Sequence, residues 1–152
     1  MNHSLGNISI IYYMLQNGRN RKMPQLVKQV GMAGHFAGLN FSRVPASIRQ
    51  PKGLKLNSAG KPNKMNSSYW QMTGVRETYP KNKVRVLNII GDIGGQTDGT
   101  VPNVSSLSLK YLVADRAKSY QVVKFTGKNA RHSKLHENPK VDKVLILSLI
   151  HI

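Results

Sequence analysis

Cysteine is absent from this chain of 152 residues, which excludes disulfide frameworks, thiolate metal sites and a cysteine nucleophile. Carboxylates are scarce, because six Asp and Glu stand against 23 Lys and Arg and give a formal net charge of +17. No apolar run approaches the roughly 20 residues of a membrane span. Closely spaced metal ligands are missing, as is a phosphate-binding glycine loop between a strand and a helix. The sequence therefore predicts a protein without a metal or an organic cofactor.

A chain this basic is a candidate for binding nucleic acid by neutralising phosphates. Its Lys and Arg are spread between Arg19 and Lys143, and its aromatic residues do not alternate with them as in a stacking platform. The pattern fits a solvated basic surface, or attraction to an anionic cell wall or membrane, at least as well. A non-catalytic basic surface, interaction or nucleic-acid-binding protein is the alternative to the enzyme hypothesis developed below, and no specific nucleic acid partner is expected.

Stretches with helical and strand periodicity alternate along the chain. Helices are predicted over residues 5–16, 67–78, 105–113 and from 140 onward, and strands over residues 27–33, 84–90 and 120–126. This alternation predicts an α/β fold in which about three parallel strands carry helices on both faces. In the first helix, the apolar residues that recur at helical spacing and are expected to face the sheet are Leu5, Ile8, Ile11, Tyr12 and Leu15.

The pentapeptide Asn-His-Ser-Leu-Gly at residues 2–6 is similar to the Gly-x-Ser-x-Gly elbow that presents a nucleophilic serine on a sharp strand-to-helix turn. Ser4 is then the candidate nucleophile, and Gly6 matches the second glycine. Asn2 departs from the first glycine, although asparagine tolerates strained backbone better than most residues. The alternative is that Ser4 is an ordinary helix cap.

Two aspartates follow the predicted strand 84–90, at the carboxyl end where parallel sheets carry functional side chains. Asp98 is preferred as a triad acid, because it leads directly into the next predicted helix. Asp92 lies at the strand tip, where it could bond loop N–H groups instead. Either aspartate could simply form an Asx turn.

Histidine candidates for a base are few. His132 is preferred, because it ends the short polar loop after the last predicted strand. His136, expected at the start of the final helix, is the alternate. His35 follows the predicted strand 27–33 and could line a pocket mouth or be an ordinary loop residue, and His3, beside the serine, is a further pocket candidate.

Four segments of the chain, residues 2–16, 34–38, 60–65 and 127–139, resemble one family. It is the lipase-like cell-surface α/β-hydrolases of Gram-positive bacteria, whose substrates are mostly unassigned. The resemblance covers nearly the whole chain, and segment 127–139 is its most specific part. It implies an α/β-hydrolase fold, a small-molecule or lipid ester as substrate, and a location outside the cell or on its surface.

The resemblance also implies roles for individual residues. Ser4 would be the nucleophile, Asp98 the acid and His132 the base of a triad, with the Leu5 N–H as one oxyanion donor. His132 would take the Ser4 proton as the hydroxyl attacks an ester carbonyl, while Asp98 orients the imidazole. The expected function is a serine hydrolase of carboxylic esters.

The predicted elbow lies at residues 2–6, although a hydrolase of this type places its nucleophile after the fifth strand of the sheet. We therefore expect residues 1–146 to be the carboxyl-terminal portion of one larger α/β-hydrolase domain, with an incomplete sheet and without activity alone. No export signal is recognised in these residues.

Two further segments have particular patterns. Residues 34–66 are rich in Pro, Gly, Ser and Asn and too long for a plain connection, which makes them a candidate lid or a mobile surface excursion. Residues 147–152 match the in-frame translation of a widely used transposase adapter, so we expect them to be a non-native tail. His151 would then have no functional role.

Overall fold

Four parallel strands form one sheet in the computed structural model, which describes residues 1–22 and 26–150. The strands lie in chain order and are β1 (Asn2–His3), β2 (Lys28–Met32), β3 (Arg85–Asp92) and β4 (Ser119–Thr126). The expected parallel α/β sheet is confirmed, with one strand more than the three that periodicity indicates. The additional strand, β1, has only two residues, which is too short for any periodicity to be seen.

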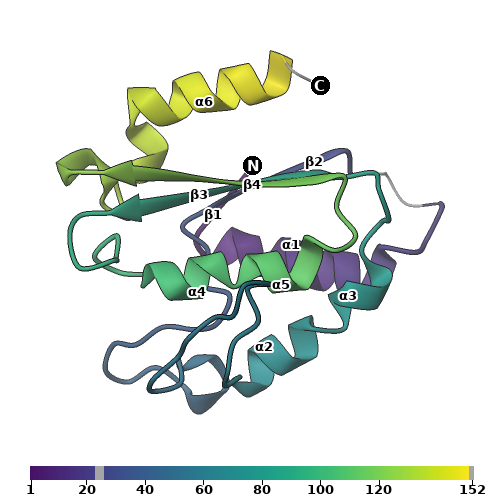
Figure 1. The fold of residues 1–152 in the computed structure, drawn as a ribbon, viewed down its shortest axis with the longest axis horizontal. Helices are drawn as coiled ribbons and strands as arrows, with labels where there is room; N and C mark the ends of the chain where they lie inside the picture. Colours follow the sequence, from purple (N-terminus) through teal and green to yellow (C-terminus); the bar gives the residue numbers. More distant parts are fainter. Residues whose placement is uncertain (23–25, 151–152) are drawn as a thin grey trace.

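Helices cover both faces of the sheet, as predicted. They are α1 (Leu5–Asn17), α2 (Ser67–Met72), α3 (Val75–Thr78), α4 (Asn103–Leu107), α5 (Leu109–Val113) and α6 (Pro139–Ile150). Figure 1 shows α6 alone on one face, with α1, α4 and α5 against the other. The inner six residues of β3 are buried between these layers, which is why the strand is mostly apolar apart from the buried Asn88. Among the described residues, no helix has both the length and the apolar character needed to cross a bilayer.

Two helices predicted as continuous are each interrupted. The first, over 67–78, breaks at Gly74, where a Cβ would lie 2.7 Å from the Leu15 side chain of α1. The second, over 105–113, starts earlier and breaks at Ser108, whose hydroxyl donates to the Ser105 carbonyl. Local side-chain hydrogen bonds and close packing of this kind are tertiary details that helical periodicity does not register.

The predicted buried face of α1 is confirmed at Ile11, with Ile8 and Tyr12 packed against the core, but differs at Leu5. Its buried residues are Asn7, Ile11 and Met14, whereas Leu5 is 67% exposed. The prediction for Leu5 was wrong: Leu5 is the first residue of α1, directly after the turn at Ser4 that follows the two-residue strand β1. His136 also differs, since it lies in a separate 3₁₀ turn, Leu135–Glu137, before α6 begins.

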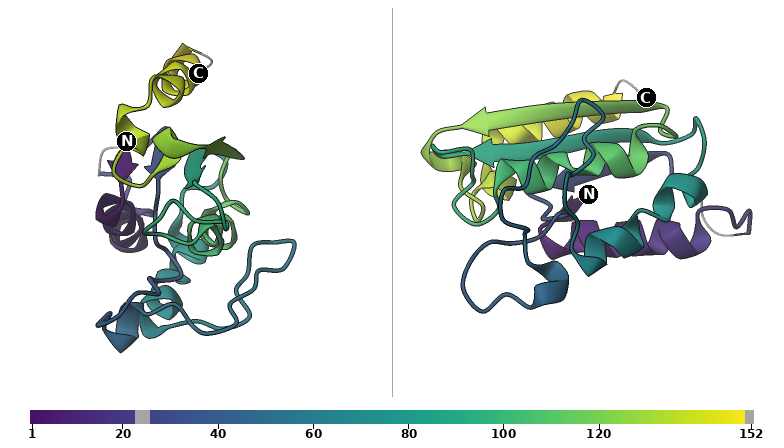
Figure 2. Two further views of the ribbon diagram at one scale, coloured as in Figure 1. Left: turned by 90° about the vertical axis from the view of Figure 1, so that its left-hand side faces the viewer. Right: turned by 60° about the horizontal axis from the view of Figure 1, so that its bottom comes forward.

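The segment 34–66 lies on the side of the sheet that α1, α4 and α5 cover, away from α6 (Figures 1 and 2). It contains a 3₁₀ turn, Ala46–Ile48. The Asn66 amide donates to two carbonyls within it, and the Ser105 hydroxyl of α4 donates to the Gly38 carbonyl. The Asn66 bonds hold the segment together, and the Ser105 bond attaches it to α4; its role as a lid stays a prediction. At the other end of the chain, residues 147–150 continue α6, and His151 lies outside the described residues.

Candidate active site

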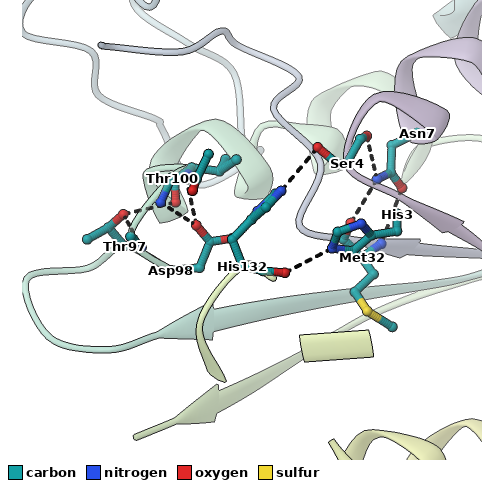
Figure 3. Close-up of polar contacts among 10 residues, drawn as sticks. His3, Ser4, Asn7, Met32, Thr97, Asp98, Thr100 and His132 are labelled. Atoms are coloured by element: carbon teal, nitrogen blue, oxygen red, sulfur yellow. Dashed lines mark hydrogen bonds and ion pairs between the residues drawn. The ribbon is translucent and has the colours of Figure 1, made fainter. Parts of the chain in front are cut away.

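The three residues predicted as a triad meet at the carboxyl edge of the sheet (Figure 3). Ser4 follows β1, Asp98 lies in the loop after β3, and His132 lies in the loop after β4. The His132 Nε2 atom is 3.1 Å from the Ser4 Oγ atom, and the His132 Nδ1 atom is 2.8 Å from the Asp98 Oδ2 atom. The histidine side chain therefore bridges the hydroxyl and the carboxylate.

Ser4 has a strained backbone. Its φ of 50° and ψ of −118° lie in a region that residues other than glycine rarely adopt. The turn reverses the chain between β1 and α1, and the Ser4 N–H donates to the Met32 carbonyl at 3.0 Å. The Ser4 side chain makes no capping hydrogen bond to α1, which disfavours the interpretation as an ordinary helix cap.

Asn2 fits the elbow for a different reason from the one expected. It lies in β1 with no positive φ, so its backbone has no need for glycine. A Cβ built on Gly6 would lie 3.6 Å from the Asn2 Cβ, an ordinary van der Waals contact. The elbow thus accommodates the asparagine without strain at residue 2.

Asn7 supports the serine turn, a role that the sequence analysis did not identify. The residue is fully buried on α1, and its amide nitrogen donates to the Ser4 and Met32 carbonyls, each at 2.9 Å. Its Oδ1 atom accepts the Met32 N–H at 3.2 Å. A Cβ on Gly31 would lie 2.8 Å from this Oδ1 atom, so the glycine provides the space for the amide. An isolated polar residue such as Asn7 forms no pattern with its neighbours in α1, so the sequence did not predict this role.

The Asp98 carboxylate is 2% exposed and accepts two backbone hydrogen bonds at Oδ1, from Thr100 at 2.9 Å and from Val101 at 2.6 Å. The His132 N–H also donates to the Asp98 carbonyl at 2.9 Å, which holds the two loops together. Because a carboxylate only accepts, the Nδ1 atom of His132 is the donor to Asp98. The neutral imidazole then leaves Nε2 as an acceptor for the Ser4 hydroxyl.

Two of the other predicted histidines lie beside the triad. The His3 Nε2 atom donates to the His132 carbonyl at 3.0 Å, and its ring centroid is 4.9 Å from that of His132 and 5.0 Å from that of His136. Burial lowers the pKa of His3. His136 is exposed, with its Nε2 atom 3.6 Å from a Glu137 carboxylate oxygen. His3 therefore contacts the loop that carries His132, whereas the alternate His136 lies against Glu137 and the His3 ring.

His35 lies in the loop after β2 and is 9% exposed. Burial lowers its pKa, and His132 lowers it further. Asp92 ends β3 and accepts the Gly94 N–H at 2.8 Å, a bond that is the main cause of its lowered pKa; Lys124 lies 3.6 Å away. Asp92 thus stabilises its own turn, as the alternative interpretation expected, while Asp98 contacts the histidine.

The start of α1 supplies a backbone donor next to Ser4. Leu5 is the first residue of that helix, so its N–H precedes the position where i to i−4 bonding begins. An N–H of this kind is available to an anion. Among the described residues, no cluster of three or more His, Cys, Asp or Glu is suited to hold a metal ion.

Comparisons with known proteins place this geometry in a family context. The family model described as "Alpha/beta hydrolase of unknown function (DUF915)" matches residues 1–151. A solved gene product of Listeria innocua is 25% identical with a TM-score of 0.75, and the match covers 94% of this chain and 53% of that protein. A candidate cell surface hydrolase of Lactobacillus plantarum WCFS1 is 20% identical with a TM-score of 0.65, covering 99% of this chain and 52% of that protein. The chain spans about half the length of these structures. The comparison with curated proteins found no match.

Proposed function

The chain belongs to the family of α/β hydrolases of unknown function whose family model matches residues 1–151, and we propose that it carries the catalytic triad of a serine hydrolase for carboxylic esters. One observation carries this proposal: His132 Nε2 lies 3.1 Å from the hydroxyl of a serine on a strained strand-to-helix turn. A serine hydroxyl is a weak nucleophile unless a base removes its proton. The distance is within the range for that transfer.

In the proposed reaction, the Ser4 Oγ atom attacks the ester carbonyl carbon while His132 Nε2 takes the hydroxyl proton. Asp98 keeps the proton on Nδ1 and stabilises the imidazolium that forms. The imidazolium then protonates the leaving alkoxide, and water repeats the sequence to release the acid. The two backbone N–H bonds at Asp98 Oδ1 keep this carboxylate oriented during the cycle.

The Leu5 N–H is the proposed first donor to the oxyanion, because the residue after the nucleophile fills that place in enzymes with this elbow. The second donor in such enzymes comes from a loop between an earlier strand and helix. We propose that residues beyond this chain supply it in a longer protein, since the chain spans about half of its structural relatives. The 152 residues alone would then turn over esters slowly or not at all.

A cell-surface location is part of the proposal, because the Lactobacillus plantarum protein is described as a candidate cell surface hydrolase. The substrate would be a small-molecule or lipid ester. The net charge of +17 would favour electrostatic association with an anionic cell surface. None of these steps requires a cofactor.

Labelling with a fluorophosphonate probe, followed by hydrolysis of short p-nitrophenyl esters, tests the proposal in this chain and in a longer protein that contains it. Ser4→Ala should abolish labelling and lower kcat by up to about 10⁶-fold. Ser9→Ala is the matched control, because Ser9 is an exposed serine on α1, the helix that directly follows Ser4. Labelling that persists in Ser4→Ala, or a longer protein that neither labels nor hydrolyses esters, would favour a non-catalytic basic binding protein instead.

A further inference from the structure

A second pocket, of about 400 Å³, lies at the amino ends of the strands, opposite the edge that holds the triad. It is formed by the end of α1, Leu26 shortly before β2, and the loops that lead into β3 and β4. This is the right-hand side of Figure 1, since the arrowheads mark the carboxyl ends. The pocket is therefore separate from the proposed catalytic site.

Positive side chains gather around this pocket from three separate segments. They are Arg19 and Arg21 after α1, Lys81 and Lys83 before β3, and Arg116 before β4. No carboxylate lines the pocket, and none of the five cations forms an ion pair with a described residue. Like charges held together without counter-charges raise the local potential and concentrate anions from solution.

Two of the arginines are fixed in place by the backbone. The Nε and Nη2 atoms of Arg19 donate to the Glu77 carbonyl at 3.1 and 2.8 Å, and the Nε atom of Arg116 donates to the Tyr79 carbonyl. These bonds use only part of each guanidinium, which carries five N–H donors. Within the described part of the chain, the Glu77 carboxylate forms no ion pair with either arginine. The remaining donors are thus pre-organised for an acceptor group.

We propose that this pocket binds a phosphate-bearing anion. A guanidinium matches two phosphate oxygens at once, and lysines add charge at the rim. The buried floor includes Met14, with Tyr13 and Leu26 partly exposed around it, so the hollow can also take an apolar group attached to the phosphate. Free polyphosphates and the headgroups of anionic lipids share this chemistry. The inference goes beyond the proposed hydrolase, because it involves no residue of the triad.

The test compares two variants of the full chain that lose the same charge. Arg21→Gln, Lys81→Gln and Lys83→Gln together remove three exposed cations of the pocket but keep Arg19 and Arg116, which hold backbone carbonyls. The control variant carries Lys52→Gln, Lys64→Gln and Lys143→Gln, three exposed lysines outside this pocket. Circular dichroism verifies the fold of both variants. If the triple pocket variant unfolds, Lys83→Gln alone replaces it, with an expected loss of about fivefold.

Binding is measured by calorimetry with inorganic tripolyphosphate, and by sedimentation with vesicles of phosphatidylglycerol and phosphatidylcholine. The pocket variant should lose at least about tenfold in affinity for tripolyphosphate or for the vesicles. The control variant should lose less than about threefold. Loss with the vesicles alone identifies a lipid headgroup as the source of the phosphate.

Two results would overturn the proposal. Equal losses in the pocket and control variants would assign the binding to net charge rather than to the pocket. A loss confined to a 20-nucleotide single-stranded DNA, with tripolyphosphate and vesicle binding unchanged, would assign these cations to a nucleic acid surface.

Discussion

Replacing Asn7 with alanine should remove the side-chain hydrogen bonds that hold the Ser4 turn and lower the stability of the fold. Wild-type Asn7 makes three buried side-chain hydrogen bonds, to the Ser4 carbonyl, the Met32 carbonyl and the Met32 N–H. After the substitution, the Met32 carbonyl keeps its bond from the Ser4 N–H, and the Ser4 carbonyl keeps its bond from the backbone N–H of residue 7. The Met32 N–H loses its bond to the side chain but stays in the β1–β2 ladder, where Met32 lies in register with His3, so the cost is the loss of the three side-chain bonds.

The expected loss of unfolding free energy is about 2–4 kcal/mol. Each of the three lost hydrogen bonds contributes a net 0.5–1.5 kcal/mol or so, and their sum sets this range. Asn7→Asp should be at least as damaging, because it keeps the acceptor for the Met32 N–H but sets a carboxylate against two carbonyl oxygens. Urea unfolding measures both losses.

Asn17→Ala is the matched control for this prediction. Asn17 ends the same helix, is partly exposed, and donates one hydrogen bond to the Tyr13 carbonyl at 3.2 Å, so its replacement should cost about 1 kcal/mol or less. In conditions where each variant stays folded, Asn7→Ala should also slow fluorophosphonate labelling of Ser4 by about 10²-fold, because a displacement near 1 Å has that effect. Equal unfolding free energies for the two alanine variants would refute the assigned role of Asn7.

Three more outcomes follow from the same contacts. Asp98→Asn should lower kcat of an active longer protein by about 10⁴-fold while leaving substrate binding nearly unchanged, as a comparison of kcat with KM would measure. Burial lowers the pKa of His35, so the unfolded chain binds more protons and stability falls as pH drops below about 6.5; His35→Gln should flatten that fall in urea titrations, and an unchanged slope would contradict it. Gly91→Ala should lower the unfolding free energy by about 1–3 kcal/mol or more, because its Cβ would collide with the Ala130 carbonyl in the loop that carries His132.

The sheet and the meeting of the three triad candidates could be predicted from the sequence. Alternating strands and helices leave few alternatives to a parallel sheet, and that sheet is confirmed. The α/β-hydrolase fold and family, which the resemblance implied, are confirmed as well. Parallel strands end at one edge, so residues that follow successive strands, such as Asp98 and His132, converge there. Their convergence can be predicted from the order of strands and loops along the chain, without knowledge of side-chain packing.

The supporting residues could not be predicted in the same way. Asn7 lies where helical periodicity expects no specific role, and its function depends on Met32, which is distant in sequence. His3 contacts His132 across 129 positions of the chain. Contacts of this kind follow from the register of β1 against β2, and a two-residue strand carries no pattern that would fix that register beforehand.

Asn2 shows that the elbow can form without glycine at the first position of the motif when a glycine elsewhere provides the space. The elbow needs a strained serine and a close approach of α1 to the strand ends, rather than a glycine at one fixed position. Here the strain at Ser4 is held by hydrogen bonds from the Asn7 amide, and that amide occupies space left by Gly31, where a Cβ would lie 2.8 Å away. Because the close contact in this fold is at Gly31, residue 2 is free to carry a side chain, and the departure from Gly-x-Ser-x-Gly is compatible with the serine geometry that the motif exists to produce.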